Sequence, residues 1–277
     1  MGKKLSDTEF TIFDLETTGL EPESGERIIE VAAFRIKGNE KLGVFQSLVS
    51  PGQRPVSPGA FAVNRITQEM LAGAPKSSEV LPEFMDFISG SCLAAYNAAF
   101  DFAFLASELR LINKTLPQEL EVVDILKMAK KTLPGLERYA LWFVAGSLSI
   151  AGGQEHRALS DVKLTENVFQ KLVSLLDKKG IIEFEQFLGL FGLSSRLLDN
   201  INNSKISRIQ QALDLKTSLK IQYFSGNNAA VTEREVIPRE IKQERKQDYL
   251  VGFCNLRQEE RTFRIDNILH LEIGSSY

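Results

Sequence analysis

The chain has 277 residues, of which 43% are hydrophobic and 25% are charged, and its formal net charge is −3 at pH 7. These proportions are typical of an ordinary globular protein that forms one large domain or two smaller ones. No apolar run approaches the length of a membrane span, and no apolar segment follows Lys3 and Lys4 as it would in a signal peptide. The slight acidity argues against a protein that coats nucleic acid, but little against an enzyme that holds metal ions in an acidic pocket.

The two cysteines, Cys92 and Cys254, lie far apart in the sequence and form no C-x-x-C pair. This spacing argues against a zinc site and against a disulfide framework. We therefore expect a cytoplasmic protein without a membrane partner, and its oligomeric state stays open.

The first expected element is a buried strand over residues 10–16 that ends in two acids, Asp14 and Glu16. Because side chains alternate between the faces of a strand, both carboxylates share one face, roughly 7 Å apart along the chain. Such a pair repels and loses hydration unless a cation or a proton neutralises it, although most isolated Asp-x-Glu pairs are simply solvated. Strands expected over 28–36 and 44–49 complete an antiparallel meander.

Helical spacing follows a loop over 51–59 and predicts helices over 66–71 and 78–88. A buried strand over 93–96 then runs into a helix that continues to residue 111. Asn97 is expected to cap this helix, which places Asp101 in its first turn. The helix dipole favours a negative charge there, and that role alone would explain Asp101.

A strand over 121–123 and helices over 124–131 and 136–144 are expected next. The basic side chains late in the first of these helices are expected to complement its C-terminus; they are Lys127, Lys130 and Lys131. His156 follows a Gly-rich segment and precedes a long helix that ends near residue 176, with Asp161 in its first or second turn. The alternation of strands and helices predicts an α/β domain over residues 1–177.

The periodicity changes twice after this domain. Residues 178–215 are expected to form a linker of short helices, interrupted by the polar run 200–204. From residue 216 to 277 a small β-rich domain is expected, with a hairpin turn at 225–228. Its strands are predicted over 219–224, 230–237, 249–254, 262–265 and 268–273.

Four carboxylates, those of Asp14, Glu16, Asp101 and Asp161, fall at the ends of strands or the starts of helices, where sites form in α/β sheets. Carboxylates without thiolates select hard cations such as Mg²⁺ or Mn²⁺. Their four charges match two divalent ions, which together activate a water and stabilise the leaving oxygen of a phosphodiester. A neutral histidine beside that water, such as His156, suits the role of proton acceptor.

Three motifs, in this order, resemble those of the DnaQ-like, DEDDh-type 3′–5′ exonucleases, which have a ribonuclease-H-like fold with a mixed sheet. The resemblance covers the chain from about residue 10 to residue 176. The motifs are Phe13-Asp14-Leu15-Glu16-Thr17-Thr18-Gly19-Leu20 with Arg27-Ile28-Ile29-Glu30-Val31, then Asn97-Ala98-Ala99-Phe100-Asp101-Phe102-Ala103-Phe104-Leu105, then His156-Arg157-Ala158-Leu159-Ser160-Asp161.

The resemblance implies a role for each acid. Asp14 would bridge both metal ions, while Glu16 and Asp161 would hold the ion that carries the attacking water. Asp101 would support the second ion, partly through water, and His156 would be the general base. The expected product is a nucleoside monophosphate released from a 3′ end.

The resemblance also implies a binding site for the terminal nucleotide. Its expected residues are Leu15, Thr17, Thr18, Asn97 and Phe100. Two stretches depart from the common family pattern: Tyr96 stands where a histidine is frequent, and Val63-Asn64-Arg65 stands where Ile-His-Gly is frequent. Neither stretch supplies a metal ligand.

The C-terminal part resembles a WYL domain, a small β-rich module usually fused to regulators and thought to sense ligands, including nucleic acid. The candidate contacts to such a ligand are Tyr249, Arg261 and Arg264, which are equally well explained as sheet-surface residues. The residues that carry the resemblance are Ile221-Gln222-Tyr223, Arg234-Glu235-Val236-Ile237-Pro238, Asp248-Tyr249-Leu250-Val251-Gly252 and Arg261-Thr262-Phe263-Arg264-Ile265-Asp266-Asn267-Ile268.

The expected function is a metal-dependent 3′–5′ exonuclease acting on single-stranded nucleic acid or 3′ ends, with DNA favoured and a C-terminal domain that senses or tethers nucleic acid. Two alternatives stay open. One is an exoribonuclease that trims RNA, because the chemistry acts on the phosphodiester and need not read the 2′ hydroxyl. The other is a regulatory nucleic-acid-binding protein, although the presence of all four acids and His156 argues against it.

Overall fold

The N-terminal part of the chain builds a mixed five-stranded sheet in the order β3-β2-β1-β4-β5. The computed structural model describes residues 2–151, 157–193 and 195–276. β1 pairs antiparallel with β2, which pairs antiparallel with β3, as the meander predicted, whereas β4 runs parallel to β1 and β5. The strands are β1 (Glu9–Thr17), β2 (Ile28–Lys37), β3 (Glu40–Leu48), β4 (Cys92–Ala95) and β5 (Val122–Asp124).

The central strand β1 is buried on both faces because its apolar residues point alternately into two cores. Phe10 and Ile12 belong to one core, and Phe13 and Leu15 belong to the other. The acids of β1 therefore continue the Phe10–Ile12 face. Helices α3 (Ser77–Ile88) and α4 (Ala98–Leu111) cover the Phe13 face, and α5 (Ile125–Thr132), α6 (Leu141–Ser147) and α7 (Ala158–Asp177) cover the Phe10 face.

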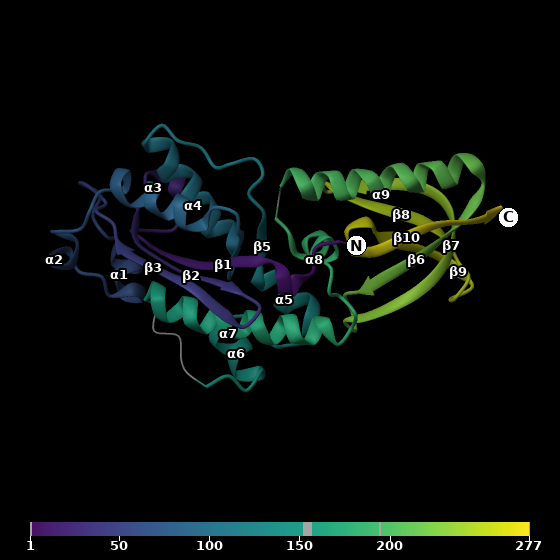
Figure 1. Ribbon diagram of the computed structural model, residues 1–277, viewed down its shortest axis with the longest axis horizontal. Coiled ribbons are helices and arrows are strands. Elements are labelled where there is room, and N and C mark those ends of the chain that lie inside the picture. The colour runs from purple at the N-terminus through teal and green to yellow at the C-terminus, as the bar shows by residue number, and fades with distance from the viewer. Residues whose placement is uncertain (1, 152–156, 194, 277) are drawn as a thin grey trace.

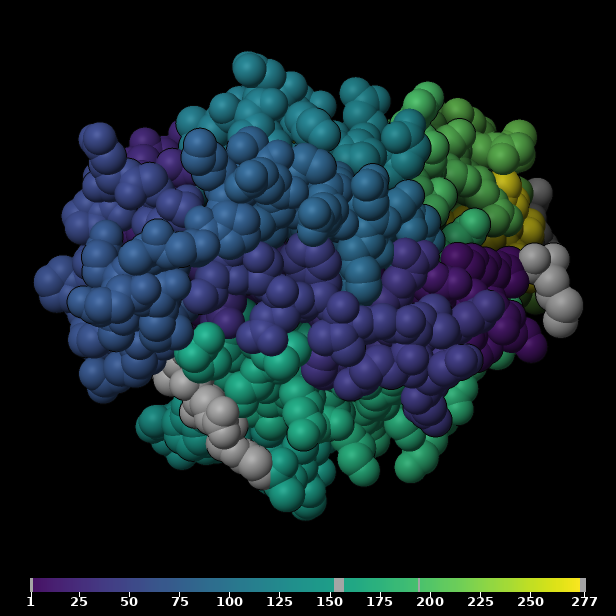
Figure 2. Space-filling view, turned by 60° about the vertical axis from the view of Figure 1, so that its left-hand side comes forward, coloured from purple at the N-terminus to yellow at the C-terminus, as the bar shows by residue number. Residues whose placement is uncertain are grey.

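Figure 2 shows this layering from outside, with residues 28–48 between the helices of 58–111 and those of 125–177. Two short helices, α1 (Pro58–Asn64) and α2 (Gln68–Leu71), follow β3. A loop was expected up to residue 59, but α1 begins at Pro58 because the Ser57 hydroxyl accepts a hydrogen bond from the Ala60 amide, 3.2 Å away. The helix expected over 136–144 instead begins at Leu141, and 3₁₀ turns occupy Leu5–Asp7, Pro22–Ser24 and Ile265–Asn267.

The C-terminal part forms a second, antiparallel sheet in the order β10-β6-β7-β8-β9 (Figure 1). Residues of α9 (Arg196–Leu215) pack on it, with Ile209 and Ala212 fully buried against the sheet. These strands confirm the predicted small β-rich domain. They are β6 (Thr217–Ser225), β7 (Ala230–Glu244), β8 (Gln247–Cys254), β9 (Glu259–Arg264) and β10 (Ile268–Ser276).

The linker contains two helices, α8 (Phe184–Phe191) and α9. The predicted interruption at the polar run 200–204 is wrong, because α9 continues through it with these side chains exposed or half-buried. Phe187 and Phe191 of α8 are buried in the core of the first sheet, which Phe224 and Leu269 of the second sheet also join.

The domain limits at 177 and 215 stay predictions. Among the described residues, no helix is long and apolar enough to cross a membrane.

Candidate active site

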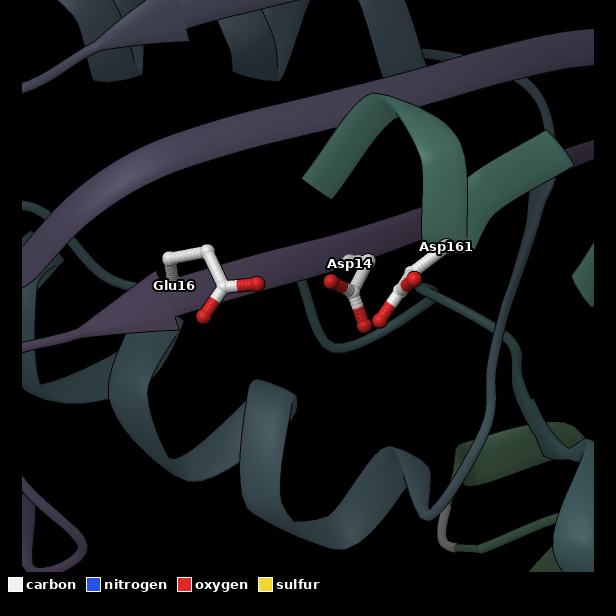
Figure 3. Close-up of side chains that lie close together, drawn as sticks. All are labelled: Asp14, Glu16 and Asp161. Carbon is white, nitrogen blue, oxygen red and sulfur yellow. The ribbon is translucent and has the colours of Figure 1, made fainter. Parts of the chain in front are cut away.

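Three carboxylates gather where β1 passes under the first turn of α7 (Figure 3). Asp14 and Glu16 come from β1, and Asp161 comes from α7. One ligand oxygen from each lies within 4.8 Å of the others. The strand period brings the first two together, and the packing of α7 on the same face of the sheet adds the third.

Asp101 approaches the same end of β1 from the first turn of α4. Its Oδ1 accepts a hydrogen bond from the Leu15 amide at 3.2 Å, and the side chain is buried. Among the neighbouring charges, that of Asp101 raises the pKa of Asp14 most. Asp101 therefore lies beside the three-carboxylate group and not within it.

The site carries several negative charges in a poorly hydrated environment. Burial and the charges of Asp101, Glu16, Asp161 and Glu30 raise the pKa of Asp14 well above its usual value. Burial, with the charges of Asp161, Glu30 and Asp101, raises the pKa of Glu16 to about 8. Burial also raises the pKa of Asp101 to about 8, against the effect of its backbone hydrogen bonds.

A divalent cation fits this group better than a proton does. The cluster found among the described residues contains only carboxylate oxygens, which are the ligands of hard cations such as Mg²⁺ and Mn²⁺. A bound cation would offset the repulsion that raises these pKa values. Asp14, Glu16 and Asp161 are the residues placed to hold it.

A pocket of about 680 Å³ opens beside Glu16. Leu15, Thr17 and Phe100, which the sequence predicted to contact substrate, line it. Thr18 is fully buried behind it, and its hydroxyl donates a hydrogen bond to Glu26. The remaining lining residues include two exposed apolar groups, Leu20 before the 3₁₀ turn Pro22–Ser24 and Val63 of α1.

Asn97 stands at the N-cap position of α4 but does not cap the helix with its side chain. The side chain makes no capping hydrogen bond, and the backbone is left-handed (φ 67°, ψ 48°) instead of the extended conformation typical of an N-cap. It is also not among the residues that line the pocket. Its contact with substrate stays a prediction.

Two further polar side chains near Glu16, those of Asn64 and Glu30, were not predicted from the sequence to belong to the site. Asn64 donates a hydrogen bond to the Thr17 carbonyl oxygen at 3.3 Å, and a hydrogen bond from its side chain lowers the pKa of Glu16. Glu30 is the cross-strand partner of Glu16. The sequence contained a signal for Glu30, because it is the one charged residue in the apolar run 28–34. His156, the expected general base, lies outside the described residues.

The three candidate residues of the C-terminal domain do not lie together. Tyr249 and Arg264 are direct cross-strand partners and share one face of the sheet. Arg261, three residues before Arg264 in a regular strand, faces the other side, where its Nη1 lies 2.7 Å from Glu259 Oε1. Arg264 pairs with both carboxylate oxygens of Asp266, at 3.0 and 2.7 Å.

Comparisons with known proteins agree with this geometry. A family model described as "Exonuclease" matches residues 11–169, and one described as "WYL domain" matches residues 204–273. The "DNA polymerase III subunit epsilon" of Treponema pallidum is 36% identical over 167 residues, which are 60% of this chain and 76% of that protein. The "DNA polymerase III PolC-type" of Thermotoga maritima is 32% identical over 251 residues, which are 89% of this chain but only 18% of that protein.

Solved structures show the same fold. The nuclease domain of 3′hExo, described as a DEDDh family member bound to rAMP, superposes with a TM-score of 0.54 at 20% identity, over 64% of this chain and 96% of that one. An E. coli ExoI–ssDNA complex gives a TM-score of 0.57 at 16% identity, over 96% of this chain and 64% of that one. At these identities the likeness concerns the fold alone.

The mixed sheet with helices on both its faces is the fold that these nuclease structures share, and the carboxylates lie at the end of its central strand, β1. The family is one of divalent-metal-dependent enzymes, and the acidic cluster accords with that. The chain belongs to the exonuclease family, whose model covers more than half of it, and its C-terminal part matches the WYL domain.

Proposed function

We propose that this protein removes nucleoside monophosphates from the 3′ ends of nucleic acid, with DNA as the favoured polymer. The observation that carries the proposal is the group of three carboxylates within 4.8 Å, placed beside a pocket of about 680 Å³. The preference for DNA rests on relatives that are described as DNA polymerase III proteins.

Different residues of the site would bind the metal, bind the terminal nucleotide and accept the proton. Asp14, Glu16 and Asp161 would hold the metal, with Asp14 shared between two ions and Asp101 supporting the second. Bound Mg²⁺ or Mn²⁺ ions would activate the attacking water and stabilise the leaving oxygen. The pocket walls at Leu15, Thr17 and Phe100 would hold the terminal nucleotide, Thr18 and Asn97 would contribute from the backbone around it, and His156 would accept the proton from the water.

The decisive test is degradation of a 5′-labelled single strand, as DNA and as RNA of the same sequence. With Mg²⁺ or Mn²⁺ we expect loss of single nucleotides from the 3′ end, faster on DNA, and none with chelator. Asp14→Asn should abolish this activity, whereas Asp86→Asn, which changes an exposed acid of α3, should leave it intact. Full activity of Asp14→Asn would contradict the proposal, and faster RNA degradation would assign the polymer to RNA.

A second test concerns the proton acceptor. His156→Ala should slow hydrolysis by roughly 10²–10⁴-fold while oligonucleotide affinity stays near that of the native protein. Single-turnover rates and fluorescence anisotropy measure the two quantities separately. An equal loss of both would argue against the role of a general base.

For the C-terminal domain we propose that the β8–β9 face holding Tyr249 and Arg264 tethers nucleic acid. Cross-strand proximity of an aromatic ring and a guanidinium supports this, since bases stack on both. Tyr249→Ala should weaken oligonucleotide affinity without changing the hydrolysis rate at saturation. Arg261→Ala, on the opposite face, serves as the matched control, and an equal effect of the two substitutions would remove the proposal.

A further inference from the structure

An ion pair between a buried glutamate and a partly exposed arginine holds the start of α7. Glu30 lies on β2 and is 1% exposed, and Arg157 immediately precedes α7. Arg157 Nη2 lies 2.9 Å from Glu30 Oε1, and Arg157 Nε lies 3.1 Å from Glu30 Oε2. The pair is therefore bidentate, which is the strong and directional form of an arginine–carboxylate contact.

Glu30 makes two further hydrogen bonds. Its Oε2 accepts one from the Ala158 amide at 3.2 Å, and its Oε1 accepts one from the Gln46 side chain at 3.2 Å. The Ala158 amide is one of the donors that a helix leaves without an internal partner at its first turn. Since the residue at the N-cap position supplies no side-chain cap, Glu30 provides that acceptor from a neighbouring strand, with the charge that the helix dipole favours.

This contact is connected to two of the proposed metal ligands. The Asp161 amide donates to the Arg157 carbonyl oxygen at 3.0 Å, so Asp161 stands one helical turn after the residue that Glu30 holds. Glu30 is also the cross-strand partner of Glu16, whose charge acts on Arg157. The carboxylate of Glu30 thus contacts the start of α7, which carries Asp161, and also lies next to Glu16 on the neighbouring strand.

We propose that Glu30 is a positioning residue for the metal site: through Arg157 and the Ala158 amide it holds the first turn of α7 so that Asp161 faces Asp14 and Glu16. This inference rests on the proposed function, because it assumes that these three acids bind the metal. Glu30 itself does not touch the metal or the substrate in this scheme. Partners that orient metal ligands typically affect metal affinity or activity by roughly 10- to 100-fold.

The chain contains a matched control. Glu108 on α4 is also 1% exposed, pairs with Arg27 through both oxygens at 2.6 and 2.9 Å, and accepts a hydrogen bond from the Ile28 amide at 3.1 Å. It has the same chemistry as Glu30 but does not hold α7. Any general cost of neutralising a buried glutamate that is paired with an arginine should therefore appear in both variants.

The experiment compares Glu30→Gln with Glu108→Gln in the full chain by Mn²⁺ titration calorimetry, with steady-state hydrolysis of an oligonucleotide alongside. We expect Glu30→Gln to weaken Mn²⁺ binding and to lower kcat by roughly 10- to 100-fold, with little change in KM. Glu108→Gln should bind Mn²⁺ like the native protein. Arg157→Lys keeps the charge on a partly exposed side chain but loses the bidentate contact, and it should give a smaller change in the same direction.

Equal Mn²⁺ affinity of the Glu30 and Glu108 variants would overturn the inference and leave Glu30 a purely structural residue. If Glu30→Gln does not fold, the Arg157→Lys variant decides, and native Mn²⁺ affinity there would equally overturn it. A native protein that neither binds Mn²⁺ nor degrades 3′ ends would instead show that the proposed function has failed.

Discussion

At the scale of single residues, the surroundings of Asp14, Glu16 and Asp101 in the folded protein disfavour the ionised form of their carboxylates. Their pKa values are raised mainly by burial, and for Asp14 and Glu16 also by the neighbouring acids. Residues with strongly shifted pKa values are typical of functional sites. Folding thus keeps together charges that the unfolded chain would separate.

This arrangement predicts how stability depends on pH in the absence of metal. The pKa of Glu16 rises from 4.5 in the unfolded chain to about 8 in the folded protein, so the folded state binds the proton more tightly. Between these values the folded protein should lose stability as pH rises, by on the order of 1.4 kcal/mol per pH unit for one group. Below pH 4.5 and above pH 8 this contribution should be flat.

Thermal unfolding in chelator across pH 4.5–8.5 measures the slope, with Glu16→Gln as the variant that should reduce it. Adding Mn²⁺ should raise the melting temperature more at pH 8 than at pH 5.5, because the cation binds the ionised carboxylates. A melting temperature in chelator that increases through this interval in the native protein but not in Glu16→Gln would contradict the prediction.

At the scale of elements, the position of each proposed ligand follows from how its element packs. β1 directs Phe13 and Leu15 into one core and Phe10 and Ile12 into the other, and the acids continue the second face. α7 packs on that face through a stripe of buried side chains that includes Val162 and Phe169. The metal site is therefore located at one end of the interface between a strand and a helix.

Close packing between two strands of the C-terminal sheet leaves no room for a side chain at Gly252. A Cβ on Gly252 would lie 2.5 Å from the Ile237 carbonyl oxygen and 2.7 Å from Val236 Cγ1. We expect Gly252→Ala to destabilise this domain by about 1–3 kcal/mol, because β7 and β8 must move apart. Chemical denaturation followed by circular dichroism measures the change.

The control for this prediction is Gly226→Ala in the β6–β7 turn, where an added Cβ meets nothing within 4 Å. Its effect should be small. Mn²⁺ affinity should be unchanged in both variants, since the substitutions lie in the other sheet. If Gly252→Ala unfolds at the same denaturant concentration as the native protein, the prediction is contradicted.

At the scale of the whole molecule, a lysine of α5 links the first part of the chain to the C-terminal domain. Lys130 and Lys131 lie in the last turn of α5, as the sequence predicted, whereas Lys127 lies in its first turn, and Lys131 also reaches the C-terminal domain. Its Nζ lies 3.7 Å from Asp266 Oδ2 and donates a hydrogen bond to Asn267. Lys205 of α9 lies near the same turn, where its Nζ contacts the Ile265 carbonyl oxygen at 3.5 Å.

Lys131 and Lys205 are largely shielded from solvent beside the carboxylate of Asp266, and this environment predicts that two substitutions differ in their effect on stability. Burial lowers the pKa of Lys131 to about 7 and that of Lys205 to about 8, while the charge of Asp266 opposes both shifts. Asp266→Asn should destabilise the protein by about 3–5 kcal/mol at pH 6, because it leaves buried ammonium groups unpaired. Lys131→Met should be nearly neutral, since Arg264 still pairs with Asp266.

The pH dependence of this effect has a definite sign. Lys131 is protonated in the unfolded chain up to its usual pKa of 10.5 but loses its proton in the folded protein near pH 7. The difference in unfolding free energy between native protein and Asp266→Asn should therefore shrink from pH 6 to pH 9. Urea unfolding at the two pH values measures it, and a difference that grows with pH would contradict the assignment.

The sequence by itself determined the class of fold and which acids to examine, because strand periodicity and the order of the three motifs are local properties of the chain. It placed Asp14 and Glu16 on one face of a strand and Asp101 in the first turn of a helix, and the structure agrees. It also predicted the β-rich second domain. Local helix propensity gave the wrong prediction at the polar run 200–204, where an interruption was expected. The helix α9 continues through this run because its other face is buried against the second sheet.

Only the tertiary structure decided the contacts that no motif carries. The contacts of Glu30 with Arg157 and of Lys131 with Asp266 each join segments more than a hundred residues apart, whereas the motifs had already predicted that Asp161 meets Asp14. Such contacts arise when whole helices and strands pack together. The residues that meet in this way show no periodic pattern in the sequence. The pairing register of β8 with β9 likewise decides that Tyr249 shares a face of the sheet with Arg264 and not with Arg261.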